Sequence, residues 1–175
     1  MPENCNGSGA SLADGFGVLN AAGRAGLALP LAETMLAGWL LSQANIAAPS
    51  DAMTIAPVLP RDCVALDDDG TLTGTVRGIP FASDARHIAV IGNGANGSAI
   101  ALVATTDCRI TPGLNLASDA SDTVIFENVR PLAIEPAPKD FDATALLLMG
   151  GVARSLQIAG ALESMLEISV GYANE

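Results

Sequence analysis

The C-terminal segment, Thr144 to Glu175, constrains the fold more than any other part of the chain. It contains no proline, and its apolar residues fall on more than one face of a helix. These apolar positions are Leu146, Leu147, Leu148, Met149, Val152, Leu156, Ile158, Ala159, Leu162, Met165, Leu166, Ile168, Val170 and Tyr172. A helix covered so widely needs other helices around it. The segment also ends without a glycine cap, a closing proline or a basic last turn, so we expect an interrupted helix and a chain that is a piece of a larger protein.

The charge balance limits the partners of this chain. It has 8 basic and 19 acidic residues, a net charge of -11, which argues against binding to nucleic acid or to an anionic membrane. Half of the 175 residues are apolar, enough for a sizeable core. The C-terminal helix carries Arg154, Glu163 and Glu167, so we expect it to be a buried bundle helix and not a membrane span.

The cysteines predict free thiols. Cys5, Cys63 and Cys108 are odd in number, lie far apart and have no histidine nearby, which is typical of a reducing compartment and not of a metal site. The amino terminus lacks the features of a signal peptide. We therefore expect a cytoplasmic protein without a metal centre.

The first third of the chain predicts helices. Residues 1–10 are rich in glycine and serine and predict a flexible leader. Ser11 is a plausible N-cap for a helix that extends toward Leu27. A second helix is predicted from Leu31 to Ala44, directly after Pro30. Residues 11–48 are thus expected to form one helical unit.

The middle of the chain predicts a β-domain. Short β-branched runs separated by turn residues continue from residue 49 to about residue 131. The predicted strands are 64–66, 71–76, 87–91, 99–103, 123–126 and 129–134, with a linker over 135–138. Residues 49–138 therefore form the expected β-domain with its linker, and residues 139–175 the last helical segment.

Several motifs have a functional and a plain structural interpretation. The stretch from Gly92 to Gly97 has the spelling of a dinucleotide-binding turn, but Pro112 stands where the ribose-binding acid is needed, so a hairpin loop is favoured. His87 has no acid or nucleophile near it in the sequence for a hydrolytic triad. Glu163 and Glu167 share a helix face and could act as paired carboxylates, or simply form a solvated helix edge.

Four segments, taken in order, resemble the flavin-dependent acyl-CoA dehydrogenase family. They are Leu29–Leu41, similar to the last helices of its amino-terminal domain; Ala52–Thr54, similar to the first strand of its middle domain; Ser121–Pro131, similar to the exit strand of that domain; and Ala153–Glu175, similar to the first helix of its carboxy-terminal bundle. The resemblance implies an α+β fold: a helical remnant, an antiparallel β-barrel-like middle domain and the start of a four-helix bundle.

The same resemblance implies a function in fatty-acid metabolism. Members of the family are oxidoreductases that desaturate an acyl-CoA thioester between the α and β carbons: a glutamate removes the α-proton, and the hydride passes to FAD. Electron-transfer flavoprotein is the implied electron acceptor. The implied assembly is a homo- or hetero-oligomer formed through the C-terminal helix. The glutamate base is expected outside this chain.

Four positions match flavin-contacting positions of the family: Met53, Thr54, Gly78 and Pro80. At the last two, the family places an aromatic ring and a serine or threonine. Glycine offers no ring and proline neither a hydroxyl nor an N–H donor. We therefore expect this chain alone to purify without flavin and not to oxidise acyl-CoA. The alternative to a complete enzyme is a non-catalytic, flavin-poor subunit of a heteromeric acyl-CoA dehydrogenase.

Overall fold

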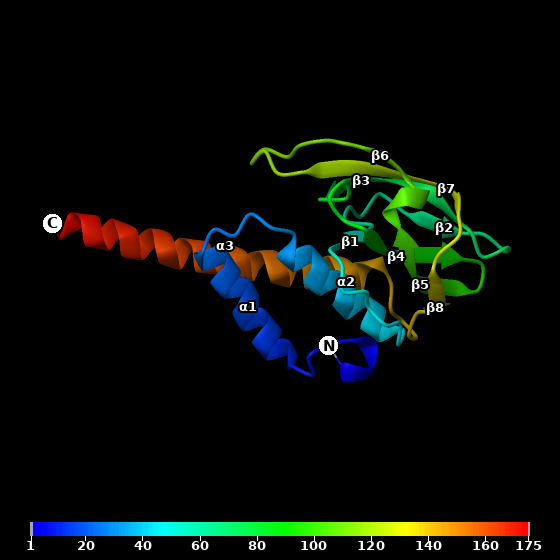
Figure 1. Cartoon of the computed structure of the whole chain (residues 1–175), viewed down its shortest axis with the longest axis horizontal. Helices are drawn as coiled ribbons and strands as arrows, with labels where there is room; N and C mark the ends of the chain where they lie inside the picture. The colour runs from blue at the N-terminus through cyan, green and yellow to red at the C-terminus, as the bar shows by residue number, and fades with distance from the viewer. Residues whose placement is uncertain (1, 175) are drawn as a thin grey trace.

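Helices and one sheet make up the protein, shown as a computed structural model in Figure 1, which describes residues 2–174. The helices are α1 (Leu12–Arg24), α2 (Leu31–Gln43) and α3 (Ala143–Ala173), with short 3-10 turns η1 (Glu3–Cys5) and η2 (Thr105–Asp107). The strands are β1 (Met53–Ala56), β2 (Val64–Leu66), β3 (Leu72–Pro80), β4 (His87–Gly94), β5 (Gly97–Ala104), β6 (Arg109–Thr111), β7 (Ser121–Val129) and β8 (Ala133–Pro136).

The predicted start of α1 is confirmed. Ser11 accepts a hydrogen bond from the Asp14 backbone N–H, and Asp14 accepts one from the Ser11 backbone N–H in return. Both interactions satisfy backbone donors that the first turn of a helix cannot pair internally. The preceding leader includes the turn η1, and the Cys5 carbonyl accepts a hydrogen bond from the Ala48 N–H. The flexibility of residues 1–10, and the domain boundaries, stay predictions.

The sheet is mostly antiparallel, as predicted, but it does not close into a barrel. Its strand order is β6-β7-β3-β2-β4-β5-β8, so β6 and β8 are its two edges. β1 and β2 both pair with β4 in parallel, one after the other along the edge of β4 that β5 does not occupy. The expectation of an antiparallel, β-barrel-like domain is therefore confirmed for the pairing of the strands, but the sheet stays open.

Three details of the β-domain differ from the sequence expectation. The hairpin at 92–97 exists, but β4 and β5 pair as far as Gly94 with Gly97, so the turn is only Ala95 and Asn96. In place of the strand expected at 129–134, β8 begins at Ala133 and ends at Pro136, within the expected linker. β8 pairs with β5. β6 was not predicted, because a three-residue edge strand carries too short a pattern to recognise.

Two hydrophobic clusters fill the interior. One lies between α2, the first half of α3 and the sheet, and includes Leu40, Leu41, Ile91 and Leu146. The other lies among the strands and includes Phe126. β4 contributes alternate side chains to each, with Ile91 in the first cluster and Val90 in the second.

The long helix α3 is confirmed, and its two ends differ in their surroundings. Glu175 lies outside the described residues. The buried positions Leu146, Ala153 and Gly160 all lie in its first two thirds, whereas the end of the helix projects away from the body of the molecule (Figure 1). Exposed apolar side chains on α3 are Leu148, Val152, Ile158, Leu162, Met165, Leu166, Ile168, Val170 and Tyr172.

Within the described residues, α3 is the one helix long and apolar enough to cross a membrane by length and composition. Its charged residues, however, are used in contacts with other helices. Arg24 of α1 forms ion pairs with Glu163 and Glu167, and Arg154 pairs with Glu33 of α2. Charged side chains are rare in membrane-spanning helices, so these pairs favour a protein environment for α3.

Candidate active-site cleft

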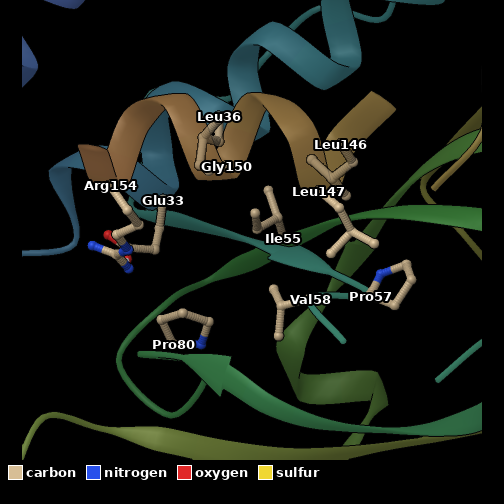
Figure 2. Close-up of a pocket in the computed structure, with 11 residues that line it drawn as sticks. Glu33, Leu36, Ile55, Pro57, Val58, Pro80, Leu146, Leu147, Gly150 and Arg154 are labelled. Atoms are coloured by element: carbon tan, nitrogen blue, oxygen red, sulfur yellow. The ribbon is translucent and has the colours of Figure 1, made fainter. Parts of the chain in front are cut away.

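An apolar cavity lies between α2, α3 and the segment that follows β1 (Figure 2). Its volume is about 210 Å³. Aliphatic and proline side chains line most of it: Leu36 from α2, Ile55, Pro57 and Val58 from β1 and the following loop, Pro80 from β3, and Leu146 and Leu147 from α3. Gly150 and Gly151 of α3 also line the cavity and leave room because they have no side chains.

An ion pair bounds one end of this cavity. Figure 2 shows the side chains of Glu33 and Arg154 pointing toward each other from α2 and α3. The Arg154 Nη2 donates to the Glu33 Oε1, and its Nη1 donates to the Gln157 Oε1 at 2.8 Å. The Glu33 side chain is 2% exposed and that of Arg154 is 52% exposed. The carboxylate is therefore buried, while the guanidinium reaches solvent.

A second, more polar cavity of about 330 Å³ lies on the other side of this ion pair. Its lining comes from the α1–α2 connection, the end of β3, the β6–β7 hairpin and α3: Leu27, Ala28, Leu29, Glu33, Gly78, Pro80, Phe81, Asn115, Asp119, Ala120, Ser121, Arg154 and Gln157. Glu33, Pro80 and Arg154 line both cavities. Together the two cavities form the candidate site.

The structure brings three of the four predicted flavin-contacting residues together. Thr54 is fully buried, and its hydroxyl donates a hydrogen bond of 2.6 Å to the Pro80 carbonyl. Gly78 lies two residues earlier on β3, at a φ of 70° that favours glycine. The Thr54 hydroxyl is thus already committed, and Pro80 presents no donor to a ligand.

The side chain of Met53 points away from the other three residues. It faces a groove between the N-terminal segment, α1 and α2, because successive side chains of a strand point to opposite faces. Its backbone N–H and carbonyl both hydrogen-bond the Thr34 hydroxyl at 3.2 Å. The sequence resemblance implied that Met53 would approach the flavin through its backbone and Thr54 through its hydroxyl. The two side chains lie on opposite sides of β1, and the contacts with flavin stay predictions.

The loop after β1 covers the backbone at Gly78. A Cβ atom on Gly78 would lie 3.9 Å from side-chain atoms of both Val58 and Leu59. The loop is held there by Asp62, whose carboxylate accepts hydrogen bonds from the Arg77 backbone N–H at 2.6 Å and from its Nη1 at 2.9 Å. This anchor was not found from the sequence, because an acid and a base 15 residues apart have no recognisable pattern.

These contacts do not fit a flavin ring at Gly78 and Pro80. Aliphatic side chains of the loop lie beside Gly78, and the Thr54 hydroxyl is buried and donates to the Pro80 carbonyl. The hydroxyl that lies close to Gly78 is that of Ser121, the strand partner of Pro80, at 3.7 Å from a Cβ built on Gly78. Flavin contact by the four residues stays a prediction.

Among the described residues that line the two cavities, the carboxylates are Glu33, which is paired with Arg154, and Asp119, which lies on the exposed hairpin. Neither is a free, enclosed general base.

No protein-family model matches the chain, and no curated protein does. Solved structures do match. One match is a variant of the Tcur3481–Tcur3483 steroid ACAD, with a TM-score of 0.76 at 22% identity. The match covers 100% of this chain and 53% of the steroid ACAD chain. The ChsE4–ChsE5 complex from Mycobacterium tuberculosis has a TM-score of 0.78 at 21% identity, and covers 99% of this chain and 53% of that one.

A glutaryl-coenzyme A dehydrogenase in complex with glutaryl-CoA has a TM-score of 0.75 at 15% identity, and covers 100% of this chain and 54% of that one. The chain thus spans about half the length of the solved structures that it matches. Identities this low establish the fold and not the activity. The chain therefore has the fold of the corresponding half of the acyl-CoA dehydrogenases, and the resemblance found in its sequence is confirmed at that level.

Proposed function

We propose that this protein serves in FAD-dependent α,β-desaturation of acyl-CoA thioesters as a flavin-poor subunit of a heteromeric acyl-CoA dehydrogenase. The fold supports the general class. Two of the matched structures are each described by a pair of proteins, ChsE4–ChsE5 and Tcur3481–Tcur3483, which supports a heteromeric arrangement here. In this proposal, a partner subunit supplies the flavin and the general base.

The observation that carries this proposal is the state of the predicted flavin site. Val58 and Leu59 lie beside Gly78, and the buried Thr54 hydroxyl is bonded to the Pro80 carbonyl. A chain that held its own flavin by these positions would need a free donor and an open face for the ring. Gly78 has no aromatic ring, Pro80 has no donor, and the loop lies beside Gly78. These features favour a flavin-poor subunit over a self-sufficient enzyme.

The apolar cavity is the proposed place for part of the acyl group. Its lining is aliphatic apart from the Glu33–Arg154 pair and is therefore suited to a hydrocarbon chain. No side chain that lines it is positioned to remove the α-proton, since Glu33 is held by Arg154. The chain would thus contribute to substrate binding and leave the chemistry to its partner.

The second half of α3 is the proposed contact with the partner. Its exposed apolar residues, such as Leu162, Leu166 and Tyr172, form a larger apolar surface than soluble monomers usually expose. Packing of helices from another subunit, or from chain that follows in a longer protein, would cover this surface. A cytoplasmic location and electron-transfer flavoprotein as the acceptor are further parts of the proposal, and they derive from the sequence alone.

The test is to isolate the tagged protein from its native cells and, separately, to purify the chain alone. We expect the native complex to contain FAD whose visible absorbance is bleached when acyl-CoA is added without oxygen. The chain alone should be colourless and show no bleaching. Stoichiometric flavin on the chain alone would favour the alternative of a self-sufficient enzyme, and a native complex without flavin would contradict both.

A further inference from the structure

The Glu33–Arg154 ion pair lies, with Pro80, between the two cavities of the candidate site. Glu33 and Arg154 line both cavities, and among the described residues they are the only charged side chains that line the apolar one. Figure 2 shows them together at one end, with Leu146, Leu147 and Pro57 toward the other. A hydrocarbon chain in the apolar cavity therefore meets a buried carboxylate and its guanidinium partner where the cavity ends.

This partition resists displacement. The Glu33 carboxylate is 2% exposed, and within the described part of the chain Arg154 is its only ion-pair partner. A ligand that pushed the Arg154 side chain aside would leave a buried negative charge without a partner, which is strongly unfavourable. The Arg154 side chain is also held by Gln157, one turn along α3. The pair thus acts as a fixed wall and not as a mobile gate.

The size of the apolar cavity agrees with such a wall. Its volume of about 210 Å³ is below the range of roughly 300–1,000 Å³ that is usual for small-molecule sites. The polar cavity adds about 330 Å³ on the far side of the pair. Removal of both side chains would join the two spaces and admit a longer ligand.

We propose that Glu33 and Arg154 are specificity-determining residues that limit the apolar cavity to short acyl groups. This inference rests on the proposed function, because it assumes an acyl thioester as the ligand. The ligand class is a short, uncharged aliphatic acyl-CoA. Longer chains are excluded because they would have to lie against the buried Glu33 carboxylate or displace its partner Arg154.

The test compares the binding of butanoyl-CoA and dodecanoyl-CoA to the full chain by titration calorimetry. We expect the wild type to bind butanoyl-CoA about tenfold or more tightly than dodecanoyl-CoA. The double variant Glu33→Ala/Arg154→Ala should lose this preference, because it opens the wall without leaving a lone charge. Its circular dichroism and urea midpoint verify that it is folded, and Glu33→Gln/Arg154→Met replaces it if it is not.

A matched control removes a different ion pair from the same helix. Arg24→Ala/Glu167→Ala deletes the exposed ion pairs of Arg24 between α1 and α3 and should leave the preference for the short chain unchanged. Equal affinity of the wild type for both thioesters, or an unchanged preference in a folded double variant, would overturn the inference alone. If neither thioester bound to any form of the chain, the proposed function would fail and the inference with it.

Discussion

Gly160 provides a sharp test of how α3 is held in place. It lies where α3 crosses α1, about one turn along α3 from Gln157, whose backbone meets Gly23 of α1. A Cβ atom added to Gly160 would lie 2.0 Å from the Asn20 carbonyl oxygen and 2.8 Å from the Arg24 backbone nitrogen. Both neighbours are backbone atoms of α1, so they cannot rotate away as a flexible side chain could. The Gly160→Ala variant must therefore push the two helices apart.

The expected magnitude combines two opposing effects. Alanine in place of glycine inside a helix is favourable by roughly 0.8–1 kcal/mol. Overpacking costs typically about 1–3 kcal/mol, and helix separation would also weaken the bonds from Asn20 to Leu156 and from Arg24 to Glu167. We expect Gly160→Ala to lower the free energy of unfolding by about 1–2 kcal/mol.

Gly151→Ala is the matched control, because it makes the same substitution in the same helix. No atom lies within 4 Å of a Cβ built on Gly151. This variant should gain about 0.5–1 kcal/mol from helix propensity alone. Urea unfolding followed by circular dichroism measures both variants. The close crossing of α1 and α3 would be refuted if Gly160→Ala were as stable as Gly151→Ala.

The remaining predictions concern buried charges and thiols. Arg154→Met should destabilise the protein by about 1–3 kcal/mol because the buried Glu33 carboxylate loses its half-exposed partner, whereas Glu33→Gln/Arg154→Met should cost much less in the same urea assay; equal losses would contradict a buried charge that depends on Arg154. Asp62→Asn should cost about 1–3 kcal/mol, since an amide cannot accept both Arg77 bonds, and a neutral result would show that this anchor is unimportant. Burial, with a smaller contribution from the nearby Asp107 charge, raises the pKa of the Cys108 thiol to about 12, so maleimide near pH 8 should label the exposed Cys63 and spare Cys108 until urea is added; rapid labelling of both in the folded state would contradict this.

Short sequence patterns predicted the helices whose structure depends on residues close together in the chain. Ser11 starts α1 with its side chain, and the apolar run without proline forms α3. The sequence pattern did not predict the short strands that form because a neighbouring strand is available for pairing. β8 is a strand because β5 offers it an edge, and β6 is too short to have a period of its own.

The candidate site was less predictable because it depends on contacts between distant segments. Glu33 and Arg154 are separated by 121 residues, and nothing in either segment signals a partner in the other. The sequence did predict that Gly78 and Pro80 lack a ring and a donor, since those are properties of the residues themselves. It could not predict that the loop at Val58 would fold over Gly78, because the loop is held there by contacts with distant residues, such as the bonds between Asp62 and Arg77.

The visible absorbance of the chain, purified alone after expression in cells supplied with riboflavin, tests the central claim most directly. The account predicts a colourless protein after gel filtration. The Thr54 hydroxyl is buried and bonded to Pro80, loop side chains lie beside Gly78, and Gly78 and Pro80 themselves offer the flavin neither a ring nor a donor. A yellow protein that retains one flavin per chain through gel filtration would contradict the account and show that this chain holds its own cofactor.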